Sequence, residues 1–128
     1  MRLVLIFTFF AIVGCEMKNV PVELSEKEIL KIQNKIGADD IYFQSMYKWA
    51  DGVEKYTLAI VAQNVRDTLQ DFKKLNEETL EVLQKGKQPI SKFDDIMFIY
   101  EIHGKVGAYR SYVYNKKLEL IETEIYDH

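Results

Sequence analysis

The chain has 128 residues, of which 17 are basic and 20 acidic, for a formal net charge of −3. This length fits one domain with a modest core. The mildly acidic balance argues against nucleic acid as a partner, because phosphate binding needs a basic surface. The single cysteine excludes an internal disulfide.

The N-terminus carries the strongest signal, because residues 1–15 read MRLVLIFTFFAIVGC. Arg2 forms a short positive region, and residues 3–13 form an apolar stretch that is too short for a transmembrane helix and typical of a signal peptide. The small residue Gly14 and then Cys15 follow. We therefore expect residues 1–14 to be a cleaved signal peptide.

The segment Ile12-Val13-Gly14-Cys15 resembles the lipobox of bacterial lipoproteins. The resemblance implies cleavage between Gly14 and Cys15, a diacylglyceryl group on the Cys15 thiol, and a further acyl chain such as palmitate on the new amino group. Two or three acyl chains anchor a protein stably, whereas one anchors it marginally. Residues 15–24 are then the lipidated N-terminus and a short tether, and residues 25–128 are a single domain.

This resemblance also implies a place in the cell envelope. In a Gram-negative cell the protein is expected at the outer membrane or the periplasmic face, and in a Gram-positive cell on the outer face of the cell membrane. Glu16 is not the aspartate often linked to inner-membrane retention, and this favours the outer membrane.

The first element of the domain is predicted to be a helix over residues 26–36. Ser25 and Glu28 make a capping box at its start, and Gly37 is a natural C-cap. An apolar stripe at helical spacing runs along it (Ile29, Ile32, Ile36).

A β-hairpin over residues 41–62 is predicted next, because Asp51-Gly52 is a favoured two-residue turn. This loop sets the register and makes the apolar faces of both strands coincide. The expected cross-strand pairs are Ala50 with Val53, Tyr47 with Tyr56, Phe43 with Ile60, and Lys48 with Lys55. Residues 56–62 lack a clean period, so a helix that starts near Tyr56 is the alternative.

A second helix is predicted over residues 65–85, with Asn64 as N-cap and Gly86 as C-cap. The apolar residues depart from helical spacing near Leu75. The alternative is therefore a helix that breaks there and starts again with Asn76 as its N-cap. Three strands follow, over residues 96–103, 106–114 and 118–126. The expected register of the first two pairs Tyr100 with Tyr109 and Ile96 with Val113, and a β-bulge is expected after Leu120.

These elements predict an α+β fold in the order α-β-β-α-β-β-β, with two helices packed on one face of a mostly antiparallel sheet of about five strands. The outline is similar to cystatin-like and NTF2-like folds, in which a curved sheet surrounds a long helix. Such a fold is the alternative to two helices on one face of the sheet.

Candidate catalytic groups are few, so neither an enzyme nor a cofactor is expected. The serines (Ser25, Ser45, Ser91, Ser111) lack a nucleophile context, and the two histidines are His103 and the terminal His128. Glu101 and His103 alternate on a strand that Glu119 could approach, yet cross-strand ion pairs among Glu101, Arg110 and Glu119 are favoured over a metal site. The pairs Asp39-Asp40 and Asp94-Asp95 are expected to serve turns or caps. The acidic tail (Glu122, Glu124, Asp127) is expected to be a charged edge.

The eight tyrosines are the feature of the composition that most suggests a binding surface. Four of them are expected on the outer sheet face or edge, beside Met46 and Met97, where they would form a protein interface (Tyr42, Tyr112, Tyr114, Tyr126). Packing inside the fold is the alternative. The leading hypothesis is a non-enzymatic accessory domain that binds another envelope or secreted protein. The second is a small-ligand pocket between the sheet and the second helix, lined by Phe72, Phe98 and Tyr100.

Overall fold

The computed structural model describes residues 16–19, 26–50, 52–85 and 90–127. Within them lie the helices α2 (Glu26–Ile36) and α3 (Phe72–Gln84) and the short 3-10 helix η1 (Ile90–Lys92). They accompany a six-stranded sheet in the order β1-β2-β3-β4-β5-β6. The strands are β1 (Glu16–Asn19), β2 (Asp40–Ala50), β3 (Val53–Val65), β4 (Asp95–Ile102), β5 (Tyr109–Asn115) and β6 (Leu120–Tyr126).

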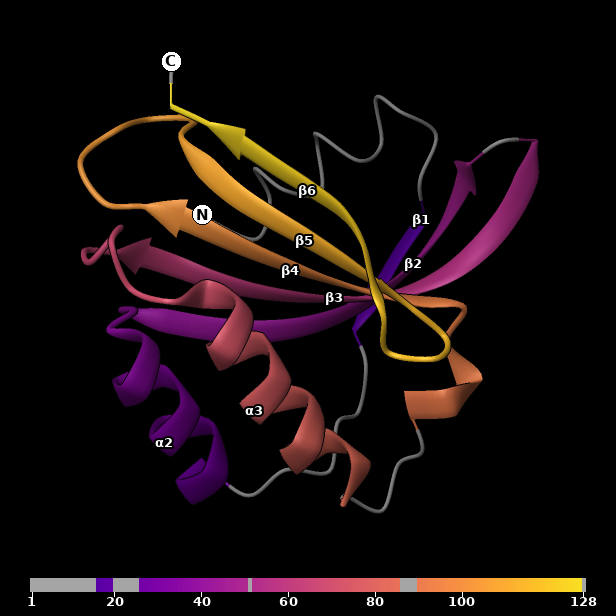
Figure 1. The fold of residues 1–128 in the computed structure, drawn as a ribbon, viewed down its shortest axis with the longest axis horizontal. Coiled ribbons are helices and arrows are strands. Elements are labelled where there is room, and N and C mark those ends of the chain that lie inside the picture. The colour runs from indigo at the N-terminus through magenta and orange to yellow at the C-terminus, as the bar shows by residue number, and fades with distance from the viewer. Residues whose placement is uncertain (1–15, 20–25, 51, 86–89, 128) are drawn as a thin grey trace.

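The sheet is mixed. Strands β3 and β4 pair in parallel, whereas all other neighbours are antiparallel. Parallel neighbours need a crossover, and α3 lies in the connection between them (Figure 1). The predicted α+β class and the order α-β-β-α-β-β-β are confirmed from α2 onward. Residues 16–19, which the sequence assigns to the tether, form an additional edge strand against β2.

The β2–β3 hairpin has the predicted register. Ala50 pairs with Val53, Tyr47 with Tyr56, and Phe43 with Ile60. Gly52 has a φ of 76°, which the turn requires and which glycine adopts without strain. Residues 56–62 are strand. They lack a period because β3 lies inside the sheet, where both of its faces are buried, so its sequence does not alternate.

The second helix is shorter than predicted, and the assignment of residues 65–71 to it is wrong. Strand β3 continues to Val65, and Asn64 has a φ of 56° and so does not cap a helix. Asp71 is the N-cap, because its side chain accepts a hydrogen bond from the backbone N–H of Lys74 at 3.1 Å. The helix then runs without a break through Asn76.

Asn76 stays inside the helix because its side chain has partners in the core. It is fully buried, accepts a hydrogen bond from the Tyr100 hydroxyl, and donates to the Tyr114 hydroxyl at 3.2 Å. Phe72, one turn earlier, packs on the Tyr100 ring with centroids 4.4 Å apart. This network joins α3 to β4 and β5.

The predicted register of β4 and β5 is wrong by one residue. Tyr100 pairs with Arg110 and Ile96 with Tyr114. The connection is a loop over residues 103–108, longer than the predicted two-residue turn, with positive φ at Gly104 and Gly107. A slip of one residue moves every side chain to the other face of a strand, so Tyr112 and Tyr114 are buried in the core.

The β-bulge expected after Leu120 is confirmed. Leu120 pairs with Tyr114 and Glu122 with Val113, so the register shifts at Ile121. Leu118, just before the strand, has a φ of 63°.

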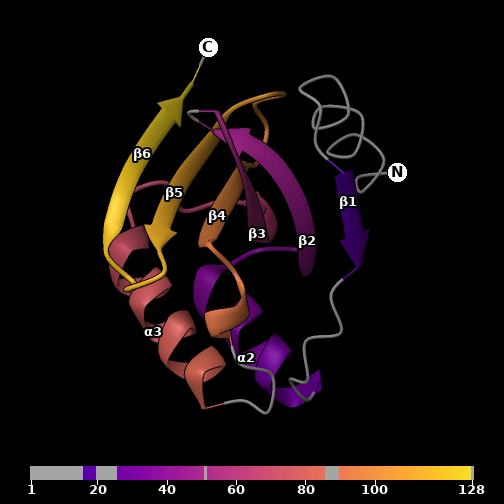
Figure 2. The same cartoon turned by 90° about the vertical axis from the view of Figure 1, so that its right-hand side faces the viewer.

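Two hydrophobic clusters occupy the two faces of the sheet. The larger contains buried side chains of α2, α3 and alternate residues of β2–β5, among them Ile36, Leu80, Ile60 and Phe98. The smaller comes from the intervening strand positions and contains no residue of either helix (Met46, Ala59, Val61, Met97, Val113). Figure 2 shows α2 and α3 lying together below the strands. In the described part of the chain, neither helix has the length and apolarity needed to cross a membrane.

We expect Asn76→Ala to lower the free energy of unfolding by about 2–4 kcal/mol, because it strands two buried hydroxyls. Urea denaturation followed by circular dichroism measures the change. Glu77→Ala, at an exposed position of the same helix, is the control and should change the free energy of unfolding by no more than about 0.5 kcal/mol.

In the Tyr100→Phe background the Asn76→Ala change should lower the free energy of unfolding by less, because one of the two hydroxyls is gone. An equal loss in both backgrounds would contradict the hydrogen-bond network.

Candidate functional site

The candidate catalytic groups lie apart. Ser45 is buried on β2 opposite Leu58, whereas His103 is exposed beyond the far end of β4, where its N–H donates to the Val65 carbonyl. Ser25 and His128 lie outside the described residues. The structure therefore does not bring Ser45 and His103 together.

The candidate metal ligands are separated too. Glu101 lies at one end of β4, opposite Tyr109, and Glu119 lies in the turn at the other end of β5, where its carboxylate accepts from Asn115 Nδ2 at 3.2 Å. No group of three potential ligands occurs among residues that the structure describes. The expected ion pair between Glu101 and Arg110 is wrong, because the one-residue register change places them on opposite faces. Arg110 instead binds Asp127 at 2.8 Å.

Asp94 and Asp95 bind the neighbouring strand β3 at the start of β4. Asp94 accepts from the Tyr56 N–H at 2.8 Å, and Asp95 accepts from the Thr57 hydroxyl. Asp39 instead forms a surface ion pair with Arg66 at 2.7 Å, and this bond holds the pKa of the Asp39 carboxyl below its usual value.

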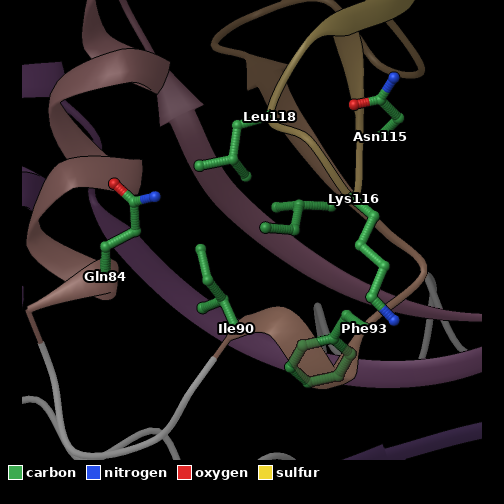
Figure 3. Close-up of a pocket in the computed structure, with 7 residues that line it drawn as sticks. Gln84, Ile90, Phe93, Asn115, Lys116 and Leu118 are labelled. Carbon is green, nitrogen blue, oxygen red and sulfur yellow. The ribbon is translucent and has the colours of Figure 1, made fainter.

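One pocket of about 260 Å³ opens beside the C-terminal end of α3. Figure 3 shows side chains from α3, η1 and the β5–β6 turn around it. The lining is partly apolar (Ile90, Phe93, Ile96, Leu118) and partly polar (Gln84, Asn115, Lys116). The residues expected to line a pocket lie elsewhere. Phe72, Phe98 and Tyr100 are packed in the larger cluster.

Two of the four tyrosines that were expected on an outer surface are inside the fold. Tyr112 and Tyr114 are buried beside α3, and burial raises the pKa of both hydroxyls. Tyr42 packs against the smaller cluster, in which Met46 and Met97 are buried. Tyr126, which is 45% exposed, lies at the sheet edge as expected.

The exposed apolar surface lies instead along β6. Every residue of this edge strand after Leu120 is exposed, and Ile121, Ile125 and Tyr126 are 52%, 60% and 45% exposed. The strand is fixed to β5, because the Tyr109 and Tyr126 rings stack with centroids 5.7 Å apart and the Tyr109 hydroxyl donates to Glu124. That bond raises the pKa of Tyr109 to about 12.

A second exposed apolar site was missed at the sequence level: the tip of the β2–β3 hairpin. Tyr47, Trp49 and Val53 are 36%, 65% and 57% exposed. The signal was present, because the alternation of apolar residues in β2 continues to the turn. What the sequence did not show is that the helices end before reaching this tip.

Comparison with known proteins supports the fold alone. No family model and no curated protein matches the chain. A crystal structure of the sex pheromone staph-cAM373 precursor is similar, with a TM-score of 0.50 and 14% sequence identity over 88% of this chain. The match covers 44% of that chain, so this protein spans less than half of its length.

We expect Glu124→Gln to lower the pKa of Tyr109 from about 12 toward the ordinary value of about 10. A tyrosine with a raised pKa stabilises the fold below its unfolded pKa, and this contribution is lost as the pH rises through the folded pKa. The loss should therefore fall between about pH 10 and pH 12 in the native chain. NMR titration of tyrosine side-chain carbons measures the pKa. Glu122→Gln is the control, because Glu122 lies on the same strand but opposite Val113. This change should leave the pKa of Tyr109 unchanged.

Proposed function

We propose that the chain is a lipid-anchored protein of the cell envelope whose domain binds another envelope or secreted protein and catalyses no reaction. The observation that carries the binding role is the exposed β6 edge. Ile121, Ile125 and Tyr126 are exposed apolar side chains on a strand that has a neighbour on one side, β5, and Ile125 and Tyr126 lie on opposite faces of that strand. A strand of this kind offers a partner both backbone hydrogen bonds and side-chain contacts.

The charges of β6 narrow the class of partner. Glu122 and Glu124 are exposed between the apolar residues, and Asp127 follows. A second copy of the same strand would bring these carboxylates together, and like charges opposite one another destabilise a strand pair. The edge therefore disfavours self-association and favours a partner segment with basic and apolar side chains.

The anchor is proposed from the sequence. The lipobox-like segment ends in Gly14 and Cys15, and cleavage between them would leave the Cys15 amino group and thiol for acylation. Envelope localisation follows from that anchor. We further propose that α2 and α3 cover the same face of the sheet, which their shared cluster with Ile60 and Phe98 supports.

A second candidate function is binding of a small molecule in the pocket beside α3. Its apolar lining residues and the ammonium group of Lys116 suit a small amphipathic anion. Its volume of about 260 Å³ lies just below the usual range for ligand sites.

Crosslinking of the full-length protein in its own membranes, followed by mass spectrometry, tests the binding role. We expect one envelope or secreted protein to be enriched, and the Ile121→Lys/Ile125→Lys variant to lose most of it, because cations replace the apolar contacts. Val106→Lys is the matched control, because Val106 is 92% exposed but lies in the loop before β5. Equal enrichment by both variants would contradict a role for β6.

The mass of the mature protein tests the anchor. We expect the native chain to begin at Cys15 and to carry acyl groups, whereas Cys15→Ser should carry none and should leave the membrane fraction. An unmodified Cys15 in the native chain would overturn the anchor without bearing on the β6 edge.

A further inference from the structure

The tip of the β2–β3 hairpin is apolar and exposed on both of its faces. Trp49, which is 65% exposed, lies on the face of β2 that carries Tyr47, whereas Val53, which is 57% exposed, lies on the other. Large apolar side chains gathered on a projecting hairpin are uncommon on a surface that meets only water. Figure 1 shows this hairpin extending away from α2 and α3.

The aromatic side of the tip is held in place. The rings of Tyr47 and Tyr56 stack with centroids 4.7 Å apart, and Tyr56 stacks on Phe93 at 4.8 Å. Phe93 is buried, so this row joins the tip to the core. Trp49 therefore extends from a rigid base, and its ordering on contact with a partner costs little conformational entropy.

The strand β1 ties the N-terminal anchor to this tip. Its first residue, Glu16, pairs with Tyr47, and β1 runs antiparallel to β2. Cys15 is the residue before Glu16, and consecutive Cα atoms are about 3.8 Å apart. Trp49 is two residues beyond Tyr47, or about 7 Å along β2. Acyl chains on Cys15 would therefore enter a bilayer within roughly 15 Å of Trp49.

We propose that the hairpin tip docks on the phospholipid bilayer that holds the Cys15 lipid, with Trp49 at the membrane interface. The proposal rests on the proposed lipid anchor. Tryptophan and tyrosine are enriched at this depth, where the ring is partly in hydrocarbon and its polar group stays hydrated. The tip carries both signs of charge, with Glu54 exposed across from Trp49 and Lys55 beside it. Docking is therefore driven by apolar insertion and does not require anionic lipid.

The chain offers its own reporter, because Trp49 is its single tryptophan. The test reconstitutes the full-length, lipidated protein into phosphatidylcholine vesicles whose acyl chains carry bromine, a quencher of tryptophan emission. We expect the emission of Trp49 to shift to shorter wavelength and to lose most of its intensity relative to unbrominated vesicles. The matched control is Trp49→Phe/Val106→Trp, since Val106 is exposed in the β4–β5 loop at the opposite end of the sheet.

Quenching of Trp49 without quenching of the relocated tryptophan establishes the docked tip. An unquenched Trp49 in protein whose Cys15 is shown by mass spectrometry to be acylated overturns the docking and leaves the anchor intact. Equal quenching of both reporters also overturns it, because the domain would then contact the bilayer without a defined orientation. A chain that carries no lipid overturns the docking together with the anchor.

Discussion

The parallel pairing of β3 with β4 is the constraint on which the rest of the fold depends. It joins two antiparallel halves of the sheet, and it forces the chain to cross over through α3. The junction is fixed where the two strands start: Asp94 exchanges backbone and side-chain hydrogen bonds with Tyr56 at 2.7 and 2.8 Å, and Asp95 accepts from Thr57. Because β3 has neighbours on both sides and side chains over both faces, its residues 57–63 are all buried.

The same constraint explains which parts of the fold could be predicted from the sequence. The β2–β3 hairpin was predictable, because a two-residue turn at Gly52 leaves one register in which the apolar faces coincide. The β4–β5 register was not, because the loop with Gly104 and Gly107 permits more than one length. The predicted start of α3 is wrong because a strand buried on both faces and a buried helix can have the same run of apolar residues over a short stretch.

The register of β5 also decides where function can reside. With Tyr112 and Tyr114 turned inward, both side chains are buried in the core, and Asn76 donates a hydrogen bond to the Tyr114 hydroxyl. The tyrosine excess is therefore largely structural, and the outer-face interface predicted from it has lost two of its four residues. Among the described residues of the sheet itself, the large exposed apolar side chains lie on β6 and at the tip of the β2–β3 hairpin. Sequence patterns report this poorly, because exposure there depends on where the helices end.

The two proposed surfaces are compatible because they lie at different places on the sheet. The strand β1 is one edge and β6 the other, and the five strand spacings of about 4.8 Å between them amount to roughly 24 Å measured along the curved sheet. Under the proposed lipid anchor, β1 would begin one residue after the lipid, and its pairing with β2 would set the orientation of the domain on the membrane. The proposed β6 binding edge would then be presented at a fixed place beside the bilayer. A fixed orientation of this kind would lower the entropy lost when a membrane partner binds. It would also exclude partners whose binding segment cannot reach the distance from the bilayer at which β6 is held.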